Sequence, residues 1–310
     1  MMQAWIGIDF GGTNIRFATY LVENDTFVDV NKKQVQQQKD VETEIMVNIA
    51  RPITEIIKIN QKKGIEVTKI GISLAASFNR ETGNITKWPN NNKWKDTPLG
   101  SILNKQFNLP VLLEDDANSA AMGELWKGAG ESYHNMIYVT VSTGIGCGMI
   151  LNDKLIIGSN GWAGELGHIK VSDNEEEICT CGKFGCIQAI ASGPAIVKKY
   201  NSLMGKEDIG KARWANEIIC KAEKGDPTCV SILKGAGKVL GESIGNLSIL
   251  LDVSLIVLGG GVISEKNIYY QYIEEGVYSS LQEQKNVEIK LSELSDINGI
   301  LGICALMKNN

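Results

Sequence analysis

The chain has 310 residues, which is enough for one large domain or for two of ordinary size. Hydrophobic residues make up 43% and charged residues 22%, a balance that indicates a globular protein with its own core. The net charge of -5 disfavours nucleic acid and anionic membranes as partners, because both bind basic faces.

The first half of the chain reads as alternating strands and helices. A strand at residues 5–8 comes first, and neither a basic-then-apolar leader nor a helix-turn-helix pattern precedes it, so we expect a cytoplasmic protein that does not bind DNA. Residues 32–39 are polar and rich in glutamine, which indicates a solvated loop or a sheet edge. The other elements predicted in this half are strands at 16–22, 67–74 and 111–113 and helices at about 41–61 and 119–126.

Three glycine-rich turns follow predicted strands. The first is Asp9-Phe-Gly-Gly-Thr-Asn14, the second is Thr143-Gly144 within residues 140–148, and the third is Gly259-Gly-Gly261. Glycine lets the backbone turn tightly and bring its N–H groups close to a phosphate. None of the three is a Walker A loop or a dinucleotide-binding motif, and one such turn alone is ordinary loop chemistry. Three in one chain predict a nucleotide held between two related halves.

The second half repeats the alternation of the first. Its predicted strands lie at 137–141, 148–151 and 254–258, and its helices near 194–200, 213–224, 227–250 and 299–308. This pattern predicts an α/β fold, and the two halves read as a distant duplication. We place an N-terminal α/β domain at residues 1–118 with about 298–310, and a C-terminal α/β domain at residues 119–297. The most apolar stretch, 247–262, is too short and too interrupted by glycine to cross a membrane.

Three cysteines and a histidine have the spacing of a metal site. Cys179, Cys181 and Cys186 fall within eight residues, with glycines between them, and His168 lies eleven residues before the first. Three thiolates and an imidazole make a closed tetrahedral zinc site without an open position, which predicts a structural metal. The alternatives are free thiols or a disulfide, and a reducing compartment disfavours the disulfide.

Five motifs, taken in order, resemble those of the ROK family of sugar kinases. They are Asp9-Phe-Gly-Gly-Thr-Asn14, Glu114-Asp-Asp-Ala-Asn118, Gly161-Trp-Ala-Gly-Glu-Leu-Gly-His168, Cys179-x-Cys-Gly-x-x-Gly-Cys186 and Val257-Leu-Gly-Gly-Gly261. The resemblance covers nearly the whole chain. It implies the two-domain actin-like ATPase fold, also called hexokinase-like or ribonuclease H-like, with a catalytic cleft between the domains. The family also includes transcriptional repressors, which resemble this chain with a DNA-binding domain added in front.

The resemblance also implies a role for each matching residue. Asp116 is expected to be the general base that takes the proton of the sugar hydroxyl, although its place at a helix start also fits a helix cap. His168 is expected to bind zinc with one ring nitrogen and to face a sugar hydroxyl with the other. Residues expected around the sugar are Ala76, Asp115, Glu165, His168 and Gln188. Residues expected to bind ATP, with Mg²⁺ near the first of them, are Asp9, Gly11, Gly12, Thr13, Asn14, Thr143, Gly144, Gly259 and Gly260.

This chain departs from the family pattern mainly on the sugar side. Asp115 stands where the family usually has asparagine, Gln188 where it has glutamate, and Ala76 where it has glycine. Ser142 replaces a glycine beside the second phosphate turn. A carboxylate next to Asp116 should raise the pKa of that residue by like-charge repulsion. We therefore expect ATP and zinc, whereas the identity of the sugar stays open.

The leading hypothesis is an ATP-dependent hexose kinase, similar to glucokinases, that phosphorylates the 6-hydroxyl. N-acetylmannosamine, allose, fructose or a β-glucoside are alternative substrates within the same class. A second hypothesis, from another class, is a sugar-sensing binding protein descended from a kinase. In both cases the partner is a small-molecule sugar, and we expect a homo-oligomer, in its simplest form a dimer. Sugar-dependent release of ADP separates the two hypotheses.

Overall fold

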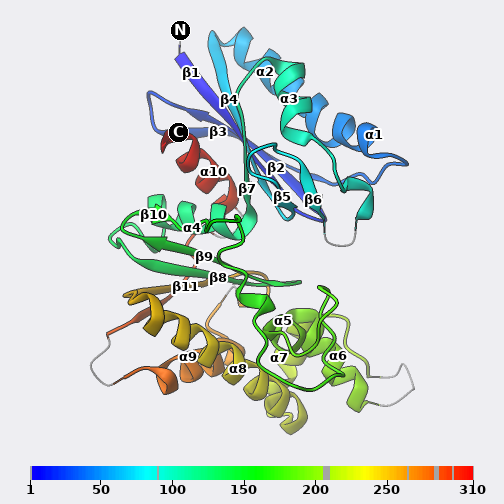
Figure 1. Cartoon of the computed structure of the whole chain (residues 1–310), viewed down its shortest axis with the longest axis vertical. Coiled ribbons are helices and arrows are strands. Elements are labelled where there is room, and N and C mark those ends of the chain that lie inside the picture. The colour runs from blue at the N-terminus through cyan, green and yellow to red at the C-terminus, as the bar shows by residue number, and fades with distance from the viewer. Residues whose placement is uncertain are drawn as a thin grey trace. The chain divides into compact units, whose positions relative to one another are not determined.

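The computed structural model describes residues 2–88, 91–204, 210–263, 265–282, 286–294 and 297–309. They form two compact units (Figure 1), the first made of residues 1–127 with 296–310 and the second of residues 128–295. The boundary predicted near residue 118 falls inside helix α4 (Asp116–Lys127). This helix groups with the first unit because it packs along helix α10 (Asn298–Asn309).

The first unit is built on a mixed five-stranded sheet. The strand order is β3-β2-β1-β4-β7, with β1 antiparallel to β2 and parallel to β4, and β4 parallel to β7. The strands are β1 (Met2–Phe10), β2 (Asn14–Leu21), β3 (Thr26–Gln34), β4 (Ile65–Leu74) and β7 (Val111–Asp115), and a hairpin pairs β5 (Ser77–Phe78) with β6 (Ile85–Lys87). The three parallel strands bring their carboxyl ends to one edge of the sheet.

The second unit repeats this topology. Its order is β10-β9-β8-β11-β12, with β8 antiparallel to β9 and parallel to β11, and β11 parallel to β12. The strands are β8 (Met136–Val141), β9 (Ile145–Leu151), β10 (Lys154–Leu155), β11 (Leu255–Gly259) and β12 (Glu288–Leu291). The matching order confirms the α/β class, and the shared topology is what the predicted duplication would produce.

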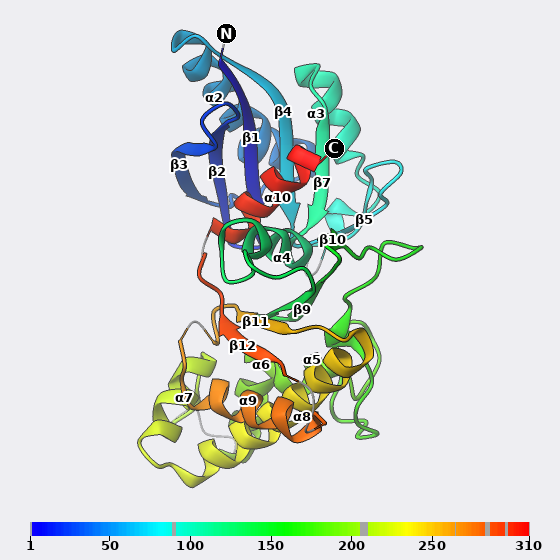
Figure 2. The same ribbon diagram turned by 90° about the vertical axis from the view of Figure 1, so that its left-hand side faces the viewer.

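Helices supply the apolar partners of both sheets. In the first unit, side chains of β1 alternate between two cores: Ile6 and Ile8 belong to a core that includes residues of the first helices, and Trp5 packs with residues of α10. Figure 2 shows helix α10 lying along strand β1. The helices of this unit are α1 (Val41–Ile45), the π-helical turn η1 (Met46–Ala50), α2 (Arg51–Lys62), the 3-10 turn η2 (Asn92–Trp94), α3 (Leu99–Phe107), α4 and α10. Those of the second unit are the 3-10 turn η3 (Leu166–His168), α5 (Ile187–Ala191), α6 (Gly193–Leu203), α7 (Ala215–Glu223), α8 (Pro227–Leu251) and α9 (Ile268–Ser280). Within the described ranges, no helix has the length and apolar character that crossing a membrane requires.

Helices α4 and α10 are neighbours (Figure 2), and their backbones approach each other closely at two glycines. A Cβ atom added at Gly302 would lie 1.5 Å from the backbone oxygen of Ser119. One added at Gly123 would lie 2.4 Å from the backbone oxygen of Asn298. Both neighbours are backbone atoms, which cannot rotate away as a side chain can. The absence of a side chain at these positions therefore sets how closely the two helices pack.

Gly302→Ala should lower the free energy of unfolding by about 2 kcal/mol or more, because overpacking pushes the two helices apart. Gly235→Ala is the matched control: this glycine is also inside a helix, but no described atom lies within 4 Å of an added Cβ. Alanine there should be neutral or stabilise by up to about 1 kcal/mol, the difference in helix propensity. Urea unfolding of both variants makes the comparison, and equal effects would contradict the packing argument.

Candidate functional site

Carboxylates gather at the carboxyl ends of β1, β4 and β7. Asp9 near the end of β1 is the register neighbour of Ser73 on β4. One position further along, Leu74 on β4 is the neighbour of Asp115 on β7. Asp116 follows directly as the first residue of α4. Because the carboxyl ends of parallel strands share an edge, the fold brings three predicted site residues, Asp9, Asp115 and Asp116, to the place where α/β sheets bind ligands.

The turn between β1 and β2 lies at the same edge. It contains Gly11, Gly12 and Thr13, and it is closed by a 3.0 Å hydrogen bond from the Gly11 N–H to the carbonyl of Asn14. Gly12 and Thr13 are exposed, and no described atom lies within 4 Å of the place where a Gly12 Cβ would stand. The turn presents backbone with open space in front of it, and this arrangement suits a phosphate group.

Asp9 is held by an ion pair. Its Oδ2 lies 3.0 Å from Nη1 of Arg16, the register neighbour on β2, and both side chains are largely buried. The pair fixes the carboxylate beside the glycine turn. Carboxylate oxygens are the ligands that Mg²⁺ prefers, so the residue type fits the magnesium-proximal place that was predicted for Asp9.

Asp115 caps helix α4. Its Oδ1 accepts hydrogen bonds from the N–H groups of Ala117 (3.0 Å) and Asn118 (3.1 Å), the pattern of an N-cap residue. Asp116 Oδ1 accepts from the Ala117 N–H at 2.9 Å. The N-cap position therefore belongs to Asp115, and Asp116 is the first residue of the helix, where it shares the Ala117 N–H.

The pKa of Asp116 is raised well above its ordinary value. Desolvation by the surrounding protein is the largest cause, and the negative charges of Asp115 and Asp9 raise the pKa further. The side chain also keeps exposed surface, which weakens the desolvation. The like charges act in the same direction, so a raised pKa does not depend on how much water reaches the carboxyl. The direction of this shift agrees with the repulsion predicted between Asp115 and Asp116, which stays a prediction.

A buried ion pair, which the sequence did not reveal, supports this junction. Glu114 is buried, and Arg80 binds it with two contacts, Nη1 to Oε2 at 2.6 Å and Nη2 to Oε1 at 2.5 Å. Oε1 of Glu114 also accepts from the N–H of Asp115 at 2.8 Å and from Nδ2 of Asn118 at 3.0 Å. A bidentate arginine with two further donors fixes the step from β7 into α4. The position of Glu114 after the apolar residues of β7 indicates a buried charge that needs a partner. The sequence does not identify Arg80 as that partner, because the two residues are 34 positions apart.

Arg80→Met should lower the free energy of unfolding by about 3 kcal/mol, because it leaves the Glu114 carboxylate buried without its counter-charge. The double change Arg80→Met with Glu114→Gln should recover part of this loss, since an amide tolerates burial better than an unpaired carboxylate. Arg51→Met, at an exposed arginine of α2, is the matched control and should change stability little. Denaturant unfolding decides. A double variant no more stable than Arg80→Met alone would mean that the charge is not the cause.

Ala76 lies just beyond the end of β4, at the same edge. Its side chain is 5% exposed and belongs to the apolar core of the first unit. The neighbouring Ala75 donates its N–H to the carbonyl of Phe10 at 3.3 Å. The methyl group of Ala76 therefore packs inward, and a ligand at this edge would meet the backbone of this segment rather than that methyl group.

Two glycine turns meet at one edge of the second sheet. Gly259, the last residue of β11, is the register neighbour of Thr140 on β8, and the turn with Thr143 and Gly144 follows directly after β8. Gly260 has a φ of +98°, and a Cβ there would lie 2.4 Å from the Val141 carbonyl oxygen. The fold thus places Thr143, Gly144, Gly259 and Gly260 at the ends of two neighbouring parallel strands, as the first unit does with its own turn.

The predicted metal ligands come together. The ligand atoms of His168, Cys179, Cys181 and Cys186 all lie within 4.8 Å of one another. The Sγ atoms of Cys181 and Cys186 are 3.8 Å apart, and Nδ1 of His168 is 3.4 Å from Sγ of Cys179. Zn–S bonds of about 2.3 Å in a tetrahedron put two sulfurs roughly 3.8 Å apart, so the donor set and its spacing fit zinc.

The remaining predicted sugar ligands lie around this cluster. Glu165 is exposed, and its Oε2 is 3.7 Å from Nε2 of His168, the ring nitrogen that faces away from the thiols. The amide of Gln188 is turned toward other protein groups: Oε1 accepts from the Ile145 N–H at 3.1 Å, and Nε2 donates to Oγ1 of Thr180 at 3.0 Å. Glu165 and His168 thus lie side by side, whereas the Gln188 side chain is engaged in contacts within the protein.

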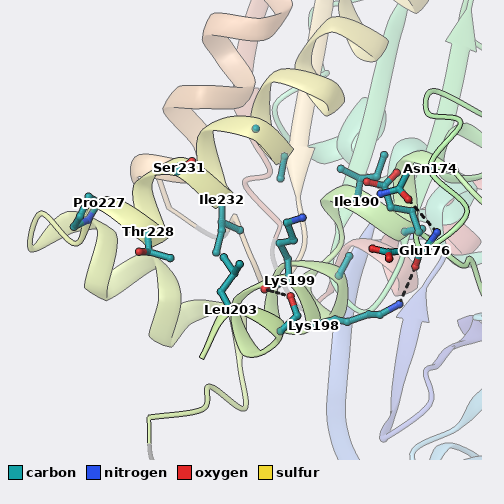
Figure 3. Close-up of a pocket in the computed structure, with 16 residues that line it drawn as sticks. Asn174, Glu176, Ile190, Lys198, Lys199, Leu203, Pro227, Thr228, Ser231 and Ile232 are labelled. Carbon is teal, nitrogen blue, oxygen red and sulfur yellow. Dashed lines mark hydrogen bonds between the residues drawn. The ribbon is translucent and has the colours of Figure 1, made fainter. Parts of the chain in front are cut away.

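A separate cavity of about 600 Å³ lies in the second unit (Figure 3). Helix α6 contributes Lys198 and Leu203 to its lining, and α8 contributes Thr228 and Ile232. The ammonium of Lys198 donates to the backbone oxygen of Glu176 at 3.2 Å. None of the predicted site residues is among the described residues that line this cavity, so it is distinct from the motifs above.

Comparison with known proteins gives a match over almost the whole chain. The family model described as "ROK family" matches residues 5–310. A glucokinase of Halalkalibacterium halodurans is 31% identical in an alignment of 315 positions that covers 97% of this chain and 94% of that protein. A xylose repressor of Caldicellulosiruptor bescii is 28% identical over 97% of this chain and 77% of the repressor. The crystal structure of a ROK family glucokinase from Streptomyces griseus in complex with glucose and AMPPNP matches with a TM-score of 0.76 and 26% identity, over 99% of this chain and 100% of that one. The structural match confirms the predicted actin-like ATPase fold.

Proposed function

Since the chain belongs to the ROK family, we propose that it is a sugar kinase that transfers the γ-phosphoryl group of ATP to the 6-hydroxyl of a hexose. Glucose is the first candidate, because glucokinases are among the relatives that match at about 30% identity. N-acetylmannosamine, allose, fructose and β-glucosides are the alternatives, because this chain differs from the family pattern at sugar-side positions.

The observation that carries this proposal is the carboxyl group of Asp116. It lies at the sheet edge formed by the carboxyl ends of β1, β4 and β7. Its side chain is exposed to solvent, and its pKa is raised. A sugar hydroxyl is a poor nucleophile, and a carboxylate improves it by accepting the proton as the new P–O bond forms. A raised pKa makes the ionised carboxylate a stronger base, provided that the pH stays above that pKa.

We assign the nucleotide to the glycine turns. Gly11, Gly12, Thr13 and Asn14 of the first unit and Thr143, Gly144, Gly259 and Gly260 of the second offer backbone N–H groups to phosphates and adenosine. Asp9, oriented by Arg16, is assigned a place near the magnesium ion that accompanies ATP. Most of the acceleration in phosphoryl transfer comes from aligning the groups and from neutralising the phosphates, and these turns supply the alignment.

We assign the sugar to Asp115, Glu165 and His168 and to the backbone beside Ala76. The Cys₃His cluster is assigned to a structural zinc ion, which would be held by Nδ1 of His168 and by the thiolates of Cys179, Cys181 and Cys186. A metal there supplies a cross-link between chain segments and fixes the ring of His168, so that Nε2 stays on the side of Glu165. The homodimer stays a prediction.

A coupled assay of ADP release tests the proposal. The purified protein is given ATP, Mg²⁺ and, one at a time, a panel of hexoses and N-acetyl amino sugars. One sugar should stimulate ADP release far above the sugar-free rate, and the product should carry its phosphate at the 6-position by NMR. ADP release that no sugar stimulates, in protein shown by calorimetry to bind a sugar, would refute the kinase.

The second candidate is a sugar-sensing protein. The observation in its favour is the xylose repressor that matches over 97% of this chain. The same panel separates the two functions, because a sensor binds its sugar without any sugar-dependent release of ADP. For the sensor, xylose belongs in the panel, since that repressor is named for it.

A further inference from the structure

Helix α5 connects the four-ligand cluster to the turn after β8. The helix begins directly after the ligand Cys186. Just beyond its other end, the N–H of Gly193 donates to the carbonyl oxygen of Ser142 at 3.0 Å. Ser142 in turn donates its N–H to the carbonyl of Gly144 at 2.9 Å. The short helix therefore reaches from a metal-ligating thiol to the backbone of the phosphate turn.

The amide of Gln188, in the first turn of α5, makes a second connection between the same two places. Its Oε1 accepts from the N–H of Ile145, the residue that ends the turn, and its Nε2 donates to Oγ1 of Thr180. Thr180 stands between the ligands Cys179 and Cys181 in the chain. One side chain thus joins the loop that carries two thiols to the turn that carries Thr143 and Gly144.

The packing around this amide leaves it little room to move. A Cβ added at Gly144 would lie 2.8 Å from Oε1 of Gln188, and one added at Gly167, next to His168, would lie 3.3 Å from the same atom. The amide oxygen therefore lies against the turn on one side and against the His168 segment on the other. A shift of this side chain would therefore displace the backbone of the turn.

We propose that Gln188 is a positioning residue that couples metal occupancy of the Cys₃His cluster to nucleotide binding at the Thr143–Gly144 turn. The inference rests on the proposed function for the identity of the ligand at that turn. With the four ligands held, Thr180 is fixed, its hydroxyl holds Nε2, and Oε1 is kept in line with the Ile145 N–H. When the loop is released, the turn loses this anchor, whereas its backbone bond from Gly193 remains.

This role differs from the sugar contact that the family resemblance implied for the same position. Both polar atoms of the Gln188 amide already have partners in the protein, at 3.1 Å and 3.0 Å. A sugar hydroxyl would have to replace one of these bonds, and the replacement would loosen either the turn or the cysteine loop. The effect of changing the side chain should therefore appear in nucleotide affinity before it appears in sugar affinity.

Thr180→Val and Thr180→Ser form a matched pair that tests the coupling. Thr180 is exposed, so neither change threatens the core, and serine keeps the hydroxyl that valine lacks. Calorimetry measures the affinity of AMPPNP with Mg²⁺ for the zinc-loaded proteins, and mass spectrometry measures their zinc content. The valine variant should bind AMPPNP about fivefold more weakly, the effect of one lost hydrogen bond, while retaining its zinc, and the serine variant should match the unsubstituted protein.

Chelation provides the second comparison. Stripping the metal from the unsubstituted protein should weaken AMPPNP binding, and stripping it from Thr180→Val should weaken binding less, because the link is already broken. If circular dichroism shows that the metal-free protein unfolds, the test rests on the zinc-loaded Thr180→Val and Thr180→Ser variants alone. Equal AMPPNP affinity of the loaded valine and serine variants would overturn the inference while leaving the proposed function intact. An unsubstituted protein that binds no AMPPNP would overturn both.

Discussion

Asp116→Asn should lower kcat by at least about 10²-fold, because an amide still forms hydrogen bonds but cannot take the proton of the sugar hydroxyl. Sugar binding should be largely retained, so the loss should appear in kcat rather than in calorimetric affinity. Asp96→Asn, at an exposed aspartate of the same unit, is the control and should leave turnover unchanged. Steady-state kinetics of both variants make the test. If Asp116→Asn turns over nearly as fast as the unsubstituted protein, Asp116 is not the general base.

The raised pKa of Asp116 adds a pH dependence with a definite sign. The base must be ionised, so kcat/KM should fall as the pH falls through the raised pKa. Asp115→Asn removes a neighbouring negative charge and should lower that pKa, which moves the acid limb of the profile to lower pH. Asparagine still accepts hydrogen bonds, so the cap of α4 is retained. Two other carboxylates lie at this junction and are unchanged in the variant. Asp9 is paired with Arg16, and Glu114 is paired with Arg80. If the acid limb of the kcat/KM profile does not move in Asp115→Asn, the charge of Asp115 does not raise the pKa of Asp116.

Cys181→Ser should abolish zinc binding, which we expect to be one ion per chain in the unsubstituted protein. Binding of a structural zinc contributes directly to folding free energy, so the variant should unfold at markedly lower temperature or denaturant concentration. Sugar affinity should fall more than nucleotide affinity, because His168 belongs to the cluster itself. His168→Ala should give the same pattern.

Cys220→Ser is the control for this experiment, because that cysteine is exposed on α7 and lies outside the cluster. Zinc content by mass spectrometry, thermal unfolding and calorimetry are the three measurements. Fully active protein that contains no zinc would refute the assignment of the metal.

The motifs that could be predicted from the sequence are local ones. A strand followed by glycines, or three cysteines within eight residues, is defined by spacing along the chain, and folding only had to bring such segments together. The same holds for the helix predicted at 41–61, whose isoleucines repeat at helical spacing and which appears as α1, η1 and α2. Local periodicity was sufficient because each segment buries one continuous face.

The elements that the sequence did not reveal depend on contacts between distant segments. β3 and β12 are edge strands, and most side chains of β3 are exposed, so the strand lacks the alternation that marks a half-buried one. Helices α3 and α9 also escaped prediction. The Arg80–Glu114 pair and the contacts of the Gln188 amide link residues 34 and 43 positions apart, and no pattern along the chain announces them. Which of two adjacent aspartates caps α4 depends on where the backbone enters the helix.

The place of α10 has a consequence for how this protein is made. The first unit takes its strands from residues that precede the second unit, but α10, which packs against Trp5 and Tyr20, is synthesised only after the second unit. The apolar face of the first sheet must wait, without its helix, while the whole of residues 128–295 is synthesised. Domains fold as units during translation, and incomplete ones expose surface that can aggregate. The second unit, although it begins later in the sequence, is therefore the first that can complete its core on the ribosome.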